Sequence, residues 1–199
     1  MVSIVEVTTK AQLRRFVEYP MELYKDVPQY IPGTYDDDLE DWDRKKNPAF
    51  EYCQARCWLA MRDGEIVGRI GAILSRKANE KWHTNRLRFT QVDFIDDYQV
   101  SRALFATVED WARQLGCTQI HGPLGFTDLD REGLLVEGFD RRSCFFTITT
   151  PITRTIWRPW AMPRTWTGSR SSSLRPPTRR SSSGGRSSAT MCSSGRSSM

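Results

Sequence analysis

The chain has few of the residues from which metal sites are usually built. Its 199 residues include only two histidines, His83 and His121, and its five cysteines form no Cys-x-x-Cys pair. Structural zinc sites need four closely spaced Cys or His ligands. The acidic stretch 35–41 lacks the spaced ligands of a hard-cation site and is expected to be a solvated loop. The sequence therefore predicts no metal site.

Long apolar runs are also missing. No stretch of 18 apolar residues occurs in the chain, so we expect no membrane-spanning helix. The first ten residues contain neither the basic nor the apolar segment of a signal peptide. Together with the cysteine pattern, these absences favour a reduced, cytoplasmic protein without membrane partners.

Acidic residues are absent from the last quarter of the chain. Segment 147–199 contains nine Arg and thirteen Ser but no Lys, Asp or Glu. It accounts for the whole formal charge of +5, because the residues before it include 20 basic and 24 acidic side chains. A basic protein suggests a nucleic-acid partner. Here the part expected to fold is mildly acidic, which disfavours that partner.

Two interpretations of segment 147–199 stay open. Back-translating Pro151–Trp166 and skipping two bases gives a sequence with the pattern of a helix, a Leu-Gly-Tyr stop and a strand. This favours a reading-frame change between about Arg141 and Thr147. The alternative is a genuine Arg/Ser arm that contacts RNA. Under either interpretation we expect a domain at 1–146 and a disordered tail at 147–199, which has too few aliphatic residues to fold.

Hydrophobic periodicity predicts the element order β–α–loop–β–β–β–α–β. The expected elements are a strand at Ser3–Val7, a helix capped by Thr9 and Gln12 and interrupted at Pro20, a loop with one helical turn at 26–47, a hairpin of Cys57–Met61 and Ile66–Ile73, a strand at Arg88–Ile95, a helix at Gln99–Leu115 and a strand at Gln119–His121. An antiparallel meander followed by a crossover helix and a strand indicates an α/β sandwich. Its sheet should be mixed and mainly antiparallel, with helices on both faces.

The hairpin carries a resemblance to a known family. Ala60–Ile70 combines an apolar strand, the turn Asp63-Gly64 and an Ile-Val-Gly strand start, and so resembles the central hairpin of the GNAT N-acetyltransferase superfamily. Lys46–Phe50 and Glu132–Phe139 resemble segments of a mostly uncharacterised bacterial GNAT-like subgroup. The resemblance implies a GNAT-like domain that is incomplete at its C-terminal end. It also implies transfer of an acetyl group from acetyl-CoA, or another acyl group from its CoA ester, to a small-molecule or peptide amine.

The resemblance also implies where the acyl-CoA co-substrate binds. In the family, a splayed fourth strand pairs with the pantetheine, and a glycine-rich loop opens the next helix to bind the pyrophosphate. The matching residues here are Phe94, Ile95, Gln99, Val100, Ser101, Arg102 and Ala103. The glycines are absent, and Asp96 and Asp97 add negative charge near the expected anion.

Two side chains are candidates for proton transfer to or from the amine. Asp93 corresponds to a carboxylate on the fourth strand, and His121 ends the last predicted strand beside Gly122-Pro123. Each also has a purely structural interpretation, Asp93 as a polar strand residue and His121 as a satisfied histidine. The missing glycines leave open a non-catalytic GNAT-fold binding module, and the tail leaves open an RNA-binding protein. The oligomeric state does not follow from the sequence.

Overall fold

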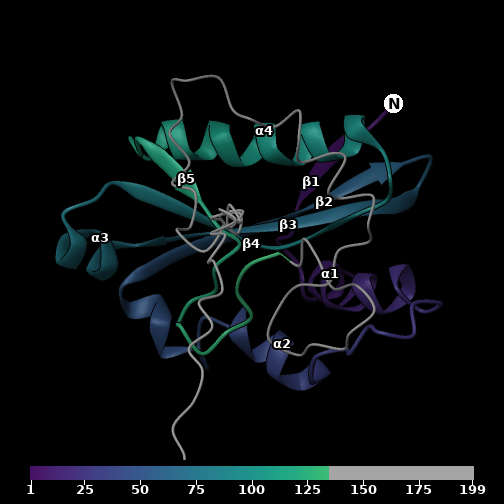
Figure 1. The fold of residues 1–199 in the computed structure, drawn as a ribbon, viewed down its shortest axis with the longest axis horizontal. Coiled ribbons are helices and arrows are strands. Elements are labelled where there is room, and N and C mark those ends of the chain that lie inside the picture. The colour runs from purple at the N-terminus through teal and green to yellow at the C-terminus, as the bar shows by residue number, and fades with distance from the viewer. Residues whose placement is uncertain (135–199) are drawn as a thin grey trace, which may run out of the picture. The chain divides into compact units, whose positions relative to one another are not determined.

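The computed structural model describes residues 1–134, which form a five-stranded sheet with helices on both faces (Figure 1). The strands lie across the sheet in chain order: β1 (Ser3–Glu6), β2 (Cys53–Arg62), β3 (Glu65–Ser75), β4 (Arg86–Phe94) and β5 (Gln119–His121). Neighbouring strands are antiparallel except for the parallel pair β4 and β5. The predicted α/β class with a mixed, mainly antiparallel sheet is confirmed.

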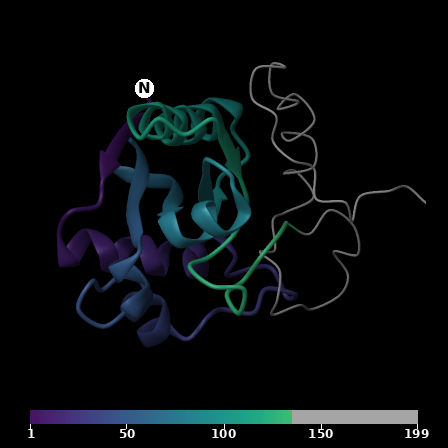
Figure 2. The same ribbon diagram turned by 90° about the vertical axis from the view of Figure 1, so that its left-hand side faces the viewer.

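Helices cover both faces of the sheet and enclose two apolar cores (Figures 1 and 2). α1 (Lys10–Leu23), α2 (Tyr35–Asp41) and the 3₁₀ helix η1 (Pro48–Glu51) lie on one face. α4 (Tyr98–Gln114) crosses the other face, where Val100, Leu104 and Val108 are fully buried against the strands. The α1 face buries Phe16, Val17 and Leu59 in a second cluster. This two-sided burial follows from the alternation of side chains along β2 and β3, apart from one register shift at Ala60/Met61.

The start of α1 is confirmed, but the predicted break at Pro20 is wrong. The Thr9 hydroxyl accepts from the Gln12 amide at 3.2 Å and the Gln12 side chain accepts from the Thr9 amide at 3.0 Å, which is the expected capping box. The helix then runs through Pro20 to Leu23. Proline removes the N–H that would bond the carbonyl four residues earlier. That carbonyl, on Phe16, accepts from the Arg69 side chain instead, so the helix continues without an orphaned acceptor.

Other differences from the predicted elements concern short helices and strand ends. Tyr35–Asp41 forms a seven-residue helix where a loop with a single turn is expected. α3 (Arg76–Trp82) was not anticipated, although the Ser75 side chain caps it by accepting from the Ala78 amide. The hairpin turn is as predicted, since Asp63 and Gly64 both have positive φ, at 51° and 88°. β2 and β4 begin earlier than predicted, at Cys53 and Arg86.

A bulge interrupts the pairing of β3 with β4. Arg69 is opposite Asp93 and Gly71 is opposite Thr90, so β4 has one extra residue between these pairs. Gln91, within the bulge, has a φ of 43°. On the other side, β5 pairs only with Arg86–Arg88 before the chain turns away at Gly122.

Four predictions fall wholly or partly outside the described residues. The frame change near residues 141–147, the tail at 147–199 and the incomplete C-terminal end of the domain lie beyond Leu134. Of the segment Glu132–Phe139, only the first three residues are described. Among the helices of residues 1–134, none is long and apolar enough to cross a membrane.

Candidate functional site

Among the strands of residues 1–134, none pairs with the second half of β4 on the side away from β3, and this side is the open edge of β4. The Leu124 amide donates to the Phe89 carbonyl at 2.9 Å, and no described strand lies beyond that point on this side of β4. On the opposite side, the Ile95 amide donates to the Val67 carbonyl of β3 at 3.0 Å. Backbone direction alternates along a strand, so Phe94 and Val92 direct their N–H and C=O groups to the open side. An extended ligand could pair with these groups as a further strand would.

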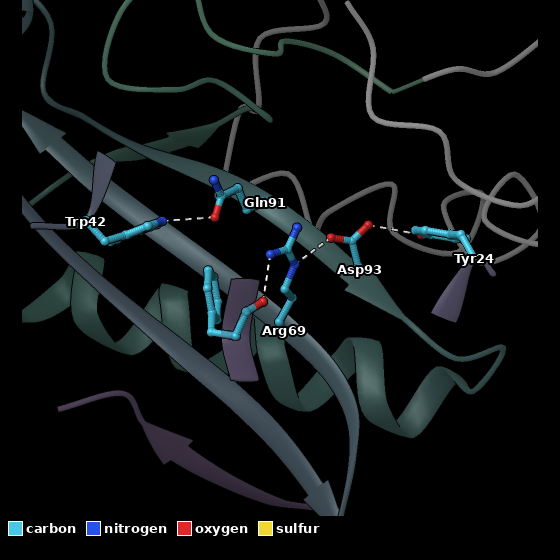
Figure 3. A network of polar contacts seen from close by, with 6 residues as sticks. Tyr24, Trp42, Arg69, Gln91 and Asp93 are labelled. Carbon is cyan, nitrogen blue, oxygen red and sulfur yellow. Dashed lines mark hydrogen bonds and ion pairs between the residues drawn. The ribbon is translucent and has the colours of Figure 1, made fainter. Parts of the chain in front are cut away.

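A buried ion pair lies beside this open edge, on the α1 face of the sheet (Figure 3). Arg69 Nε donates to Asp93 Oδ2 at 2.7 Å, and the Tyr24 hydroxyl donates to Asp93 Oδ1 at 3.0 Å. Asp93 is 2% exposed and Arg69 is 7% exposed. Both carboxylate oxygens therefore have a donor, as a charge removed from water requires.

The middle of α1 also holds Arg69 in place. Arg69 Nη1 donates to the Phe16 carbonyl at 2.7 Å, and the guanidinium carbon lies 5.0 Å from the centre of the Phe16 ring. The Phe16 carbonyl is available because Pro20 has no N–H. The sequence position of Pro20 thus supplies the acceptor that fixes the arginine.

The bulge itself is held by Trp42. Its indole N–H donates to Gln91 Oε1 at 3.0 Å (Figure 3). Its ring makes edge contacts with Phe16 and Phe126. The ring fits because residue 71 is glycine: a Cβ there would lie 2.7 Å from the indole. These contacts fix the bend of β4 at the start of its open edge.

Two tyrosines, Tyr19 of α1 and Tyr24 directly after its end, border the ion pair as neutral phenols. Burial, followed by the nearby Asp93 charge, raises the pKa of Tyr19 and of Tyr24. Tyr24 is bonded to Asp93, whereas the buried Tyr19 hydroxyl has no hydrogen-bond partner among the described residues. A buried, unpaired hydroxyl is uncommon and can bond an incoming polar group or a water.

The two predicted catalytic residues share a face of the sheet but are not brought together. His121 is opposite Arg88 on β4, before the bulge, and Asp93 lies after it. Burial lowers the pKa of His121 to about 4, with Arg88 and Arg86 adding to the effect. The histidine is therefore neutral at pH 7. Within the described region, the hydrogen-bond and ion-pair partners of Asp93 are Tyr24 and Arg69 rather than His121. The catalytic roles of Asp93 and His121 stay predictions.

The N-terminus of α4, the predicted pyrophosphate site, is capped by Asp97. Asp97 Oδ1 accepts from the Gln99 amide at 2.7 Å, and its carbonyl accepts from the Val100 and Ser101 amides. Asp97 Oδ2 pairs with Arg62 Nη2 at 2.6 Å, and this bond is the main reason that the pKa of Asp97 is lowered. An anion at this helix end would meet an ionised carboxylate, and Asp97 already accepts from the three amides through its side chain and its carbonyl.

The residues predicted to bind the co-substrate have different degrees of exposure. Gln99 and Arg102 are exposed at the helix start, and Ala103 is partly exposed. Phe94 and Ile95 are partly buried and pack on the α4 core. Val100 and Ser101 are fully buried, and the Ser101 hydroxyl donates to the Tyr98 carbonyl at 3.0 Å. Binding by these residues stays a prediction.

Sequence reasoning missed the partners of Asp93. A signal was present, because Arg69 lies inside the apolar run of β3 and a buried arginine needs an acceptor. Tyr24 and Trp42 gave no comparable signal, since Tyr24 follows the predicted interruption at Pro20 and Trp42 lies in the expected loop region. Among residues 1–134, no three His, Cys, Asp or Glu side chains gather as a potential metal site.

No protein-family model matches the chain. It is similar to Protein YghO of Escherichia coli K12, with 36% identity over 135 residues, which is 68% of this chain and 34% of that protein. It is also similar to the bacterial ceramide synthase of Caulobacter vibrioides, with 34% identity over 140 residues, covering 69% of this chain and 36% of the synthase. The chain thus spans about a third of the length of these curated relatives.

The fold is GNAT-like. This follows from the element order, the single parallel pair β4 and β5 and the helices on both faces, as expected from the sequence. Structural neighbours include a tandem GNAT protein from the clavulanic acid pathway (17% identity, TM-score 0.44, 57% of this chain and 34% of that one). A GNAT acetyltransferase of Staphylococcus aureus Mu50 is a second neighbour, with 17% identity and a TM-score of 0.44. The match covers 60% of this chain and 72% of that one.

Proposed function

We propose that this chain contains the core of an N-acyltransferase domain, which transfers an acyl group from an acyl-CoA to an amine. The observation that carries the proposal is the open edge of β4 after the bulge, which leads directly into the N-terminus of α4. The pantetheine amides would pair with the backbone of Val92 and Phe94. The acyl carbonyl would then lie near the bulge, where the amine can attack it within a ternary complex.

A lipid amine is the acceptor class that the comparisons favour. One relative is named a ceramide synthase, and a ceramide is the fatty amide of a long-chain amino alcohol, so its formation is an N-acylation. We extend this chemistry to the present chain as part of the proposal. The Tyr19 hydroxyl, which is buried on the α1 face and has no hydrogen-bond partner within residues 1–134, is a candidate contact for the polar end of such an acceptor.

The charge at the start of α4 gives a direct test of co-substrate binding. Asp97→Asn keeps a side-chain cap but removes the negative charge and releases Arg62 from its ion pair. If the CoA phosphates bind here, acyl-CoA affinity should rise about three- to tenfold. Arg62→Gln should lower the affinity. Isothermal titration of the full chain with acetyl-CoA and a long-chain acyl-CoA measures both.

Arg113→Gln, at the other end of α4, is the matched control for Arg62→Gln, because its partners Asp110 and Glu109 lie on the same helix. It should leave acyl-CoA affinity unchanged. The proposal fails if neither CoA ester binds to the wild-type chain or to the Asp97→Asn variant. Equal effects of Arg62→Gln and Arg113→Gln would argue against phosphate binding at the helix start.

A non-catalytic binding module is the second candidate function. It is favoured by one observation: Asp97 already bonds the amides at the helix start that a pyrophosphate would need. In that case Asp97→Asn would give no affinity for any acyl-CoA. Replacing Ser101 by glycine would not restore binding either.

A further inference from the structure

A basic pocket lies at the end of the domain away from the proposed acyl-CoA site. It has a volume of about 810 Å³ and lies between η1, the start of β2 and the C-terminal half of α4. At 1.5 Å per residue, the 17-residue α4 is about 25 Å long. Trp111 and Leu115 at its far end line this pocket, whereas Asp97 caps its start. The pocket is therefore separate from the site described above.

The charge of the pocket lining is strongly positive. Glu51 is its one acidic residue, against five cations: Arg44, Lys45, Lys46, Arg56 and Arg76. Lys46 is paired with Glu40 at 2.6 Å, and Arg56 is 3.6 Å from Glu6. Within the described region, the other three cations have no carboxylate within 4.0 Å. Like charges gathered in one pocket repel each other unless an anion binds among them.

Hydrogen bonds order the backbone of the segments that carry these cations. The turn that contains Arg44 and Lys45 begins at Asp43, whose side chain accepts from the Lys45 amide at 2.9 Å. The Asp43 carbonyl accepts from the amides of Lys46 and Asn47. On the other wall, the Arg76 amide donates to the Tyr52 carbonyl at 3.0 Å. A site whose backbone is already ordered loses less entropy on binding.

Aromatic rings position two of the guanidinium groups. Arg44 lies over Phe50, with 5.5 Å from its guanidinium carbon to the ring centre, and Arg56 lies over Trp111 at 5.4 Å. Stacking on a ring leaves the edge of the guanidinium, with its N–H donors, directed away from the protein. These edges can bond an oxyanion in two places at once.

The strand beneath the pocket has an open edge of its own. β1 pairs only with Trp58–Met61 of β2, and the Val7 amide donates to the Cys57 carbonyl at 2.9 Å. Strand alternation directs the backbone of Ala55 to the same side as Cys57, where no described strand covers it. Ala55 lines the pocket, so its amide is a neutral donor beside the cations.

We propose that this pocket binds a phosphate group, carried either by a soluble organic phosphate or by an anionic lipid headgroup. Arg44, Lys45 and Arg76 supply the charge, and the Ala55 amide supplies a backbone donor. Phosphate suits this arrangement because it offers several oxygens to donors that converge from a turn, a strand edge and a helix start. The proposal does not depend on the acyltransferase assignment.

The test compares two triple variants of the full chain with the same change in charge. The pocket variant is Arg44→Gln/Lys45→Gln/Arg76→Gln. The control is Arg14→Gln/Arg15→Gln/Lys25→Gln, which removes three exposed cations at and just beyond α1. Isothermal titration measures binding of inorganic pyrophosphate. Co-sedimentation measures binding to vesicles of phosphatidylglycerol mixed with phosphatidylcholine, and to phosphatidylcholine alone.

The pocket variant should bind the preferred probe roughly tenfold or more weakly, while the control stays within about twofold of the wild type. Binding of pyrophosphate identifies a soluble phosphate as the source, and binding of phosphatidylglycerol vesicles alone identifies a lipid headgroup. The comparison also removes any contribution of the nine arginines in 147–199, which both variants keep. The proposal is wrong if neither probe binds the wild type, or if both variants lose equal affinity.

Discussion

Arg69→Met is expected to destabilise the domain by about 3–5 kcal/mol, because it leaves the Asp93 carboxylate buried without its cation. Asp93 is 2% exposed, so water cannot replace the lost partner, and the remaining Tyr24 hydroxyl donates only one hydrogen bond. The substitution also leaves the Phe16 carbonyl without a donor, since Pro20 cannot supply one. Chemical denaturation monitored by tryptophan fluorescence measures the free energy of unfolding.

A second variant separates the buried charge from lost packing. Arg69→Met combined with Asp93→Asn removes both charges, and the asparagine oxygen can still accept from Tyr24. This double variant should be more stable than Arg69→Met alone by at least about 1 kcal/mol. Arg56→Met, on the neighbouring strand and half-exposed, should cost less than about 1 kcal/mol. A double variant no more stable than the single one would show that the ion pair is not the cause.

The strands, α4 and two local motifs show how much of the fold could be predicted from the sequence. The strands and α4 were predictable because their apolar residues repeat with periods of 2 and 3.6, which local sequence displays directly. The capping box at Thr9 and the Asp63-Gly64 turn are likewise local signals. The order of the strands, α1 and α4 follows from such signals, whereas the GNAT-like fold was expected from the resemblance of the hairpin Ala60–Ile70.

The site depends on contacts between residues far apart in the chain, which periodicity does not contain. Pro20 was interpreted as a helix break because only its lost hydrogen bond was considered. Its actual consequence is a free Phe16 carbonyl, which Arg69 uses from a strand 53 residues away. The bulge at Gln91 is also invisible locally, since it depends on the register between β3 and β4. Asp93 was found as a candidate, but its buried partners were not.

His121 gives the clearest pH dependence that the structure predicts. Its pKa is about 4 in the folded domain, against about 6.5 for an unperturbed histidine in an unfolded chain. Between these values the unfolded chain binds a proton that the folded domain does not. The contribution of His121 is therefore fully present above about pH 6.5 and is lost progressively as the pH falls toward 4.

Between pH 7 and pH 5 this effect should lower the free energy of unfolding by about 1–2 kcal/mol, allowing for the partial exposure of the ring. His121→Asn should remove that part of the pH dependence, as measured by urea denaturation at both pH values. Burial raises the pKa of Asp41 to about 6, which acts in the opposite direction. Because the wild type and His121→Asn both contain Asp41, the difference between their changes in unfolding free energy with pH isolates His121.

The control is His83→Asn at the exposed end of α3, where asparagine tolerates the positive φ of 50°. The prediction is wrong if the unfolding free energy of His121→Asn changes with pH as much as that of the wild type and of His83→Asn. That result would mean that burial beside Arg88 does not suppress protonation of His121.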